Sequence, residues 1–176
     1  MQHPRISSHL HPDNRPCLGV FIDAENVSGI HAERLMQSVN ELGRVTVCRA
    51  YGDWTNDFLI GWKKWLHPLG IRAVQQFHYT QGKNASTATL IMDVMEQLPA
   101  GHLDGICIAS CDSDFVGLVS RVQEHGPMVY GFGQHGASPA FIAACDEFVF
   151  LDGSSVALGA GNPELLMRQG FDPAPG

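Results

Sequence analysis

The stretch LGVFIDAEN, residues 18–26, joins a short apolar run of strand type to a polar turn that begins at Asp23. Five more runs of this kind follow along the chain, and candidate helices separate them. The predicted strands are 18–22, 45–51, 71–77, 105–109, 128–132 and 148–151, and the predicted helices are 29–42, 55–66, 86–98, 114–125 and 138–145. Because strand and helix alternate, the sequence predicts an α/β fold with a mainly parallel central sheet and right-handed crossovers.

The chain is long enough for one domain. Its 176 residues, 44% of them hydrophobic, can bury one sizeable core, and we expect the domain to occupy residues 17–152. Residues 1–16 hold three prolines and little apolar content, and residues 153–176 are rich in glycine and proline. We therefore expect a disordered N-terminal tail and a flexible C-terminal tail.

Charge and apolar content exclude several classes of protein. The formal net charge of −7 excludes a general basic surface for nucleic acid, so any such contact has to be local. No stretch approaches the roughly 20 apolar residues of a membrane span, and residues 1–17 lack the apolar core of a signal peptide. Five cysteines without C-x-x-C spacing indicate reduced, buried thiols, which is consistent with a cytoplasmic protein.

The charges are unevenly distributed along the chain. Residues 44–83 contain six basic and two acidic side chains, whereas residues 84–176 contain two basic and eleven acidic ones. A nuclease-like protein can hold phosphates with the first region and a metal with the second. Ordinary surface scatter explains the same distribution equally well.

Carboxylates follow the predicted strands at the positions where ligands bind. In an open parallel sheet the ligand site lies at the carboxyl ends of the strands. Asp23 ends the first predicted strand, Asp112 and Asp114 follow the fourth, and Asp93 lies about two turns into the third predicted helix. Carboxylates held close together need a cation or shifted pKa values. Oxygen ligands without a nearby His/Cys set favour Mg²⁺ or Mn²⁺ over zinc.

Each of these acids also has an ordinary structural interpretation. Asp112 or Ser113 can be the N-cap of the helix that follows, because both residue types are favoured there. Asp23 can be a loop residue, and Asp93 can be an exposed helical acid. The combination of three acids at matching positions favours the functional interpretation.

A second motif lies later in the chain. Residues 131–136, GFGQHG, fit the G-x-G-x-x-G fingerprint of dinucleotide binding, and Asp152 ends the next predicted strand. However, the helix that follows has room for only about eight residues and only one strand remains after it. The sequence therefore favours a turn-rich connection beside the site over a nucleotide cofactor.

Four segments of this chain follow a known family pattern. These are LGVFIDAENVSG (18–29), GKNASTATLIMDVMEQL (82–98), IASCDSDFVGLVSRVQEHG (108–126) and VYGFGQHGASPAFIAACDEFVFLD (129–152). They resemble the NYN domain of the LabA-like group, which belongs to the PIN-like nuclease superfamily. Together they cover most of residues 17–152. The resemblance implies a PIN-like three-layer α/β/α sandwich and, for active members, metal-dependent cleavage of RNA.

The resemblance also implies roles for particular residues. By position, Asp23 resembles the first metal-binding carboxylate and Asn26 the polar residue that orients it. The implied catalytic and metal-binding set is Asp23, Asp93, Asp112 and Asp114, with Asn26, Ser113 and Thr87 beside it. The implied RNA contacts are Lys83, Asn84, Arg49 and His78.

Two positions depart from the family pattern. Thr87 stands where the family commonly has an acid, and Cys111 stands where it has glycine. Losing one carboxylate lowers the charge available for a second cation, which favours a one-metal site with Asp23, Asp93 and Asp112. Cys111 adds a side chain at a tight turn from strand to helix.

These observations lead to two function hypotheses. The first is a metal-dependent ribonuclease that hydrolyses phosphodiester bonds of single-stranded RNA, with carboxylate-bound Mg²⁺ or Mn²⁺ and water as the nucleophile. The alternative is a catalytically weakened module that binds RNA or a protein partner in a regulatory role. No membrane partner is expected, and the sequence leaves room for a homo-oligomer.

Overall fold

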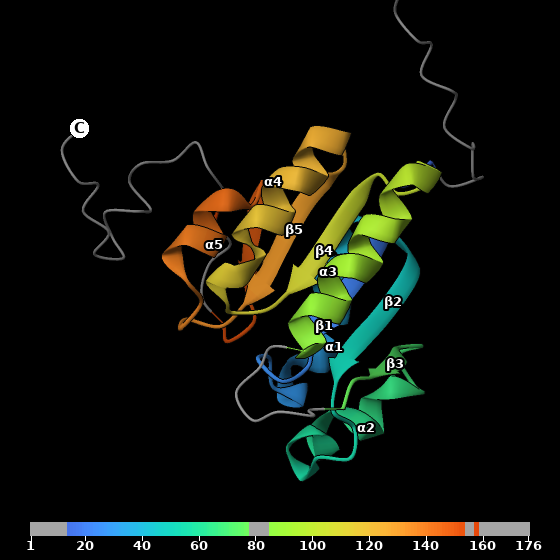
Figure 1. Cartoon of the computed structure of the whole chain (residues 1–176), viewed down its shortest axis with the longest axis vertical. Helices are drawn as coiled ribbons and strands as arrows, with labels where there is room; N and C mark the ends of the chain where they lie inside the picture. The colour runs from blue at the N-terminus through green and yellow to red at the C-terminus, as the bar shows by residue number, and fades with distance from the viewer. Residues whose placement is uncertain (1–13, 78–84, 154–156, 159–176) are drawn as a thin grey trace, which may run out of the picture.

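The structure is a computed structural model that describes residues 14–77, 85–153 and 157–158. Its centre is a sheet in the order β3-β2-β1-β4-β5-β6-β7 (Figure 1). The strands are β1 (Cys17–Asp23), β2 (Arg44–Gly52), β3 (Arg72–Gln75), β4 (Gly105–Ala109), β5 (Met128–Gly133), β6 (Glu147–Phe150) and β7 (Ala157–Leu158). The first six pair in parallel and β7 pairs antiparallel with β6.

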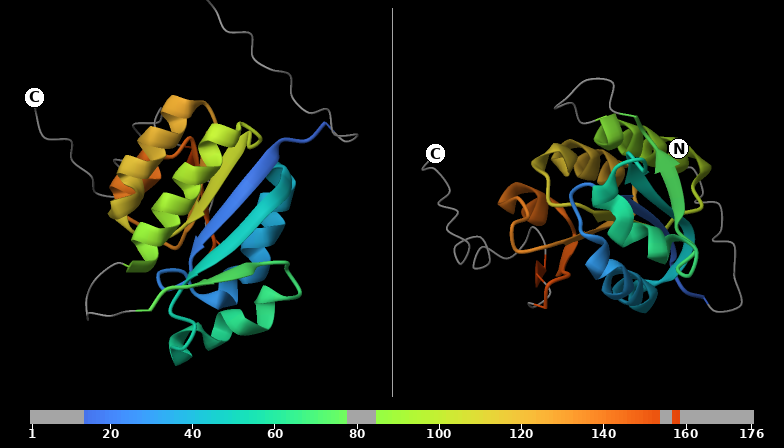
Figure 2. Two further views of the ribbon diagram at one scale, coloured as in Figure 1. Left: turned by 45° about the vertical axis from the view of Figure 1, so that its right-hand side comes forward. Right: turned by 90° about the horizontal axis from the view of Figure 1, so that it is seen from below.

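Helices cover both faces of this sheet (Figure 2). They are α1 (Ala32–Leu42), α2 (Ile60–Leu66), α3 (Ala85–Gln97), α4 (Val116–His125) and α5 (Pro139–Ala144). The 3₁₀ helices are η1 (Gly29–His31), η2 (Asp57–Leu59), η3 (Leu98–Ala100) and η4 (Ser113–Phe115). The expected three-layer α/β/α architecture is confirmed, because α1 and α2 pack on one face while α3, α4 and α5 pack on the other.

The alternation of side chains along β1 separates two cores. Leu18, Val20 and Ile22 point to the face of α1 and α2, whereas Phe21 points to the face of α3 and α4. All four are fully buried. A strand with apolar residues on both faces is typical of a parallel sheet covered by helices on each side.

The strand order determines where a ligand site can form. The chain progresses outward from β1 to β2 and β3 on one side, and from β4 to β5 and β6 on the other. The connections therefore diverge at the neighbouring carboxyl ends of β1 and β4, which is where open α/β sheets form their binding crevice. Asp23 is the last residue of β1, and Ser110 directly follows β4.

Three strand ends lead into capped 3₁₀ turns. Ser28, Asn56 and Asp112 precede η1, η2 and η4, and each side chain accepts a hydrogen bond from the backbone N–H two residues later. These caps stabilise the first turn of the helices α1, α2 and α4 that follow. Sequence patterns predicted the helices at these positions, but not that each would begin with a 3₁₀ turn.

The described residues at both ends of the chain contact the domain. Arg15 donates to the carbonyl groups of Asn40 and Gly43, and the Pro16 carbonyl accepts a hydrogen bond from Arg44. β7 adds a short antiparallel strand inside the segment expected to be a flexible tail. The rest of both expected tails lies largely outside the described residues, which leaves that prediction as it stands.

The five cysteines are free thiols that differ in burial. None of the five cysteines forms a disulfide; Cys107 and Cys145 are buried, and the other three are half-buried. Within the described ranges, no helix has the length and apolar character that crossing a membrane requires.

Replacing Gly131 by alanine should destabilise the protein. A Cβ at this position of β5 would lie 2.4 Å from Phe148 Cδ2 and 2.7 Å from Cys145 Sγ. We expect a loss of about 1–3 kcal/mol in the free energy of unfolding. Gly117 in α4 is the matched control: a Cβ there has no atom within 4 Å, so alanine should add about 0.5–1 kcal/mol. Urea unfolding of both variants measures the difference, and equal stabilities would contradict this account of the packing.

Candidate active site

The centre of the candidate site is the carboxylate of Asp23, which is only 1% exposed. Ile22 and Ala109 are neighbours in the register of β1 and β4, so the next residues, Asp23 and Ser110, also come side by side. Ser110 Oγ donates to Asp23 Oδ2 at 3.1 Å, and Asn26 Nδ2 donates to the same oxygen at 2.7 Å. The two donors fix the orientation of the carboxylate, which agrees with the role expected for Asn26.

The other oxygen of this carboxylate has no such partner. Asp23 Oδ1 is buried, and no polar group of the described residues donates to it. Burial raises the pKa of Asp23, the hydrogen bonds from Asn26 and Ser110 lower it, and the charges of Glu25 and Asp112 raise it. A buried carboxylate oxygen without a donor destabilises the ionised form, unless a cation binds it.

The loop after β4 places a second carboxylate beside the first. The backbone N–H of Asp112 donates to Ser110 Oγ at 3.2 Å, and Asp112 Oδ1 accepts a hydrogen bond from the N–H of Asp114 at 3.0 Å. Asp112 is thus the N-cap of η4 and also a charge that acts on Asp23. The N-cap interpretation of Asp112 is confirmed, and its predicted metal-binding role stays a prediction. Ser113 and Asp114 are exposed next to it.

Glu25, in the loop after β1, binds both the first turn of α3 and the loop after β2. Its Oε2 accepts a hydrogen bond from Ser86 Oγ at 2.6 Å, and its Oε1 accepts one from the N–H of Asp53 at 3.2 Å. Thr87, next to Ser86 in the first turn of α3, is buried. Sequence motifs indicated Thr87 as part of the site but not Glu25, Ser86 or Ser110. Their positions directly after β1, at the start of α3 and directly after β4 were the available signal.

The structure does not bring Asp93 into this group. Asp93 Oδ1 forms an ion pair with Arg49, and Asp93 Oδ2 accepts a hydrogen bond from the hydroxyl of Tyr51. Asp93 comes eight residues after the start of α3, which is about 12 Å along a helix. Its partners both belong to β2, and one of them, Tyr51, is the register partner of Asp23. Arg49, expected to contact RNA, is engaged in the same ion pair, and the hydrogen bond to Asp93 raises the pKa of Arg49.

Three expected RNA contacts cannot be placed. His78, Lys83 and Asn84 lie outside the described residues. Their roles stay predictions from the sequence.

The carboxylates present fit a divalent cation with few protein ligands. Among the described residues, no group of three or more His, Cys, Asp or Glu side chains is arranged to hold a metal. Mg²⁺, however, commonly uses one or two carboxylates together with water and substrate phosphates. The unpartnered Oδ1 of Asp23 and the charge of Asp112 provide such a pair. The number of cations expected from the replacement of an acid by Thr87 stays a prediction.

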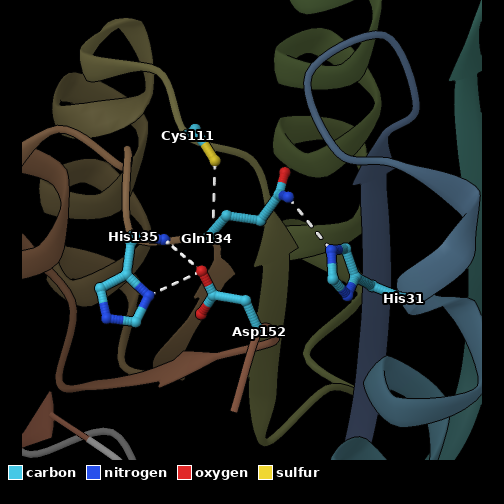
Figure 3. A network of polar contacts seen from close by, with 5 residues as sticks. All are labelled: His31, Cys111, Gln134, His135 and Asp152. Atoms are coloured by element: carbon cyan, nitrogen blue, oxygen red, sulfur yellow. Dashed lines mark hydrogen bonds and ion pairs between the residues drawn. The ribbon is translucent and has the colours of Figure 1, made fainter. Parts of the chain in front are cut away.

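A polar network lies next to this site at the carboxyl end of β5 (Figure 3). The backbone N–H of Gln134 donates to Cys111 Sγ at 3.4 Å, and the side-chain amide nitrogen of Gln134 lies 3.1 Å from Nε2 of His31. Cys111, where glycine was expected from the family pattern, is accommodated by this contact. Burial raises the pKa of its thiol. Gln134 links loops that follow β1, β4 and β5.

The glycine-rich motif at 131–136 is not built as a nucleotide site. Gly131 and Gly133 belong to strand β5 itself. A Cβ at Gly133 would lie 2.7 Å from the carbonyl oxygen of Ser110, so this glycine permits close packing of the backbone. Asp152 accepts hydrogen bonds from the backbone N–H and from Nδ1 of His135, and these bonds lower the pKa of Asp152. The predicted turn-rich connection therefore begins only after Gly133, and of the three glycines of the motif Gly136 alone lies in it.

Changing Asp23 to asparagine should stabilise the protein at neutral pH. The folded-state pKa of Asp23 is raised above its unfolded value, so ionisation is less favourable in the folded state. This penalty is absent below about pH 4, where both states are protonated, and appears as the pH rises through the folded pKa. We expect Asp23→Asn to be more stable than the parent at about pH 7.5 and to differ little from it at about pH 4.

Urea unfolding without metal measures this difference at the two pH values. Glu96→Gln, an exposed acid on α3, is the control and should show no such dependence. A variant Asp23→Asn that is less stable than the parent at neutral pH would contradict the prediction.

Comparison with known proteins gives a family match and a similar fold. The sequence profile of the NYN domain matches residues 18–152. A crystal structure of a protein of unknown function from Vibrio parahaemolyticus is similar over 84% of this chain and 100% of that chain, with 19% sequence identity and a TM-score of 0.67. At that identity the similarity shows the fold alone. Among curated proteins, none matches the sequence significantly.

Proposed function

The chain belongs to the NYN domain family, a nuclease-type family of the PIN-like superfamily, and from this premise we propose that it is a metal-dependent ribonuclease. The proposed reaction is hydrolysis of phosphodiester bonds in single-stranded RNA, with water as the nucleophile. One observation carries the proposal. Asp23 presents a buried, unpartnered carboxylate oxygen next to the charge of Asp112, at the switch point of the sheet. A fold that keeps such a destabilised group is typical of a functional site.

Residues at this edge of the sheet have two proposed roles, which are to bind the cation and to orient its ligands. Asp23 and Asp112 would hold Mg²⁺ or Mn²⁺, which supplies positive charge to activate water and to stabilise the transferring phosphate. Asn26 and Ser110 orient Asp23 through its second oxygen. Asp114 adds an exposed carboxylate beside Asp112. Mg²⁺ and Mn²⁺ share this ligand chemistry, so the choice between them is left to experiment.

Asp93 has a different proposed role from the one implied by the resemblance. Its bonds to Arg49 and Tyr51 fix α3 against β2, and α3 carries Ser86, which binds Glu25. We therefore propose that Asp93 positions α3, and with it Ser86 and Glu25, and does not contact the cation.

A second candidate function is supported by Thr87. This residue is buried at the start of α3, where the family commonly has an acid. A chain with one carboxylate fewer can keep the fold and bind RNA without cutting it. Cleavage and binding therefore have to be measured separately.

The substitution Asp112→Asn should abolish cleavage while the fold stays intact. Asparagine is as good an N-cap as aspartate, so η4 keeps its cap while the site loses a charge. We expect the rate of cleavage of a labelled single-stranded RNA to fall by roughly a hundredfold or more. Glu124→Gln, an exposed acid on α4, is the matched control and should cut like the parent.

The assay compares Mn²⁺, Mg²⁺ and a chelator with parallel preparations of all three proteins, because contaminating ribonuclease would cut equally in each. Equal cleavage by Asp112→Asn and the parent would contradict the proposal. RNA binding without cleavage by the parent would favour the second candidate function.

A further inference from the structure

Three large apolar side chains are exposed at the carboxyl edge of the sheet. Phe58 in η2 is 92% exposed, Ile30 in η1 is 77% exposed, and Ile60 at the start of α2 is 66% exposed. Single exposed apolar residues are ordinary, but a group of them marks a binding surface. We call Ile30, Phe58 and Ile60 the apolar platform.

The two turns that carry the platform pack backbone against backbone. Trp62 Nε1 donates to the Val27 carbonyl at 2.7 Å. A Cβ at Gly29 would lie 2.5 Å from the carbonyl carbon of Gly61, so only glycine permits this approach. Ile30 and Ile60 are the chain neighbours of these two glycines. The exposed side chains of Ile30 and Ile60 therefore lie next to the same backbone contact.

Basic side chains flank the platform on α2. Lys63 and Lys64 are exposed and come three and four residues after Ile60, so they share its side of the helix. They belong to the basic region at 44–83, which stands out in a chain of net charge −7. Single-stranded RNA presents phosphates to lysines and flat bases to aromatic rings. Phe58 can contact the bases of such a strand, and the two lysines can contact its phosphates.

The platform lies at the same edge as the carboxylates. The N–H of Asp53, just after β2, donates to Glu25 and so ties the loop that leads to η2 to the loop after Asp23. The right panel of Figure 2, which views the molecule from below, shows α2 beside the loop that follows β1. A strand bound on the platform would thus pass next to Asp23.

We propose that the apolar platform, with Lys63 and Lys64, binds single-stranded RNA next to the catalytic edge, and that a base stacks on Phe58. The inference rests on the proposed function, because it takes RNA as the substrate. A second copy of the chain suits this surface less well. In a two-fold pair the same patch meets itself, which would bring the lysines of both copies together.

The test measures binding of a labelled short oligouridine by fluorescence anisotropy, with chelator present to prevent metal-dependent cleavage. Phe58→Ala should weaken binding roughly tenfold and Phe58→Trp should retain it, because a base stacks on either ring. Replacing both Lys63 and Lys64 by glutamine should reduce the slope of log affinity against log salt by about 1.4, at about 0.7 per phosphate contact. Met128→Ala, a 46% exposed residue at the start of β5, is the control and should bind like the parent.

Several outcomes would overturn the inference. These are equal binding by Phe58→Ala and Met128→Ala, absence of RNA binding by the parent, and loss of a dimer in sedimentation of Phe58→Ala with no change in RNA affinity. The last would identify a second copy as the occupant. Cleavage is measured separately with metal. Weakened binding by Phe58→Ala in a protein that does not cut RNA would therefore support the platform and contradict the proposed reaction.

Discussion

The two oxygens of the Asp23 carboxylate have opposite environments, and the organisation of the site follows from this difference. Oδ2 accepts hydrogen bonds from Asn26 and Ser110, whereas Oδ1 is buried without a donor from the described residues. Such an arrangement lowers stability in the absence of a cation. The arrangement exists because the strand order places the ends of β1 and β4 side by side. The apolar packing of these two strands fixes the positions of their ends.

Polar residues at the strand ends combine structural and chemical roles. Asp112 caps η4 and also places its charge beside Asp23. Asn56 caps η2, the turn that exposes Phe58. Because these caps are local hydrogen bonds, the loops that carry them are held in place by a few neighbouring residues. The candidate site and the apolar platform thus both lie in capped turns that follow neighbouring strands.

Periodicity predicted most of the fold, because apolar runs and helical stretches alternate along the whole domain. The proximity of Asp23 and Asp112 was also predictable, since parallel strands end at a common edge. The bonds of Asp93 to Arg49 and Tyr51 were not predictable, because they depend on how far along α3 Asp93 lies. Gln134 and His31 are 103 residues apart, and local sequence contains no signal for such a contact. The membership of the LabA-like group stays a prediction from the motifs.

Direct measurement of Mn²⁺ binding tests the central claim that Asp23 and Asp112 hold a cation. Titration calorimetry with the parent, Asp23→Asn and Asp93→Asn separates the proposed ligand from the proposed positioning residue. The account predicts one bound Mn²⁺ in the parent, loss of binding in Asp23→Asn, and retained binding in Asp93→Asn. Unchanged binding by Asp23→Asn, or loss confined to Asp93→Asn, would contradict it.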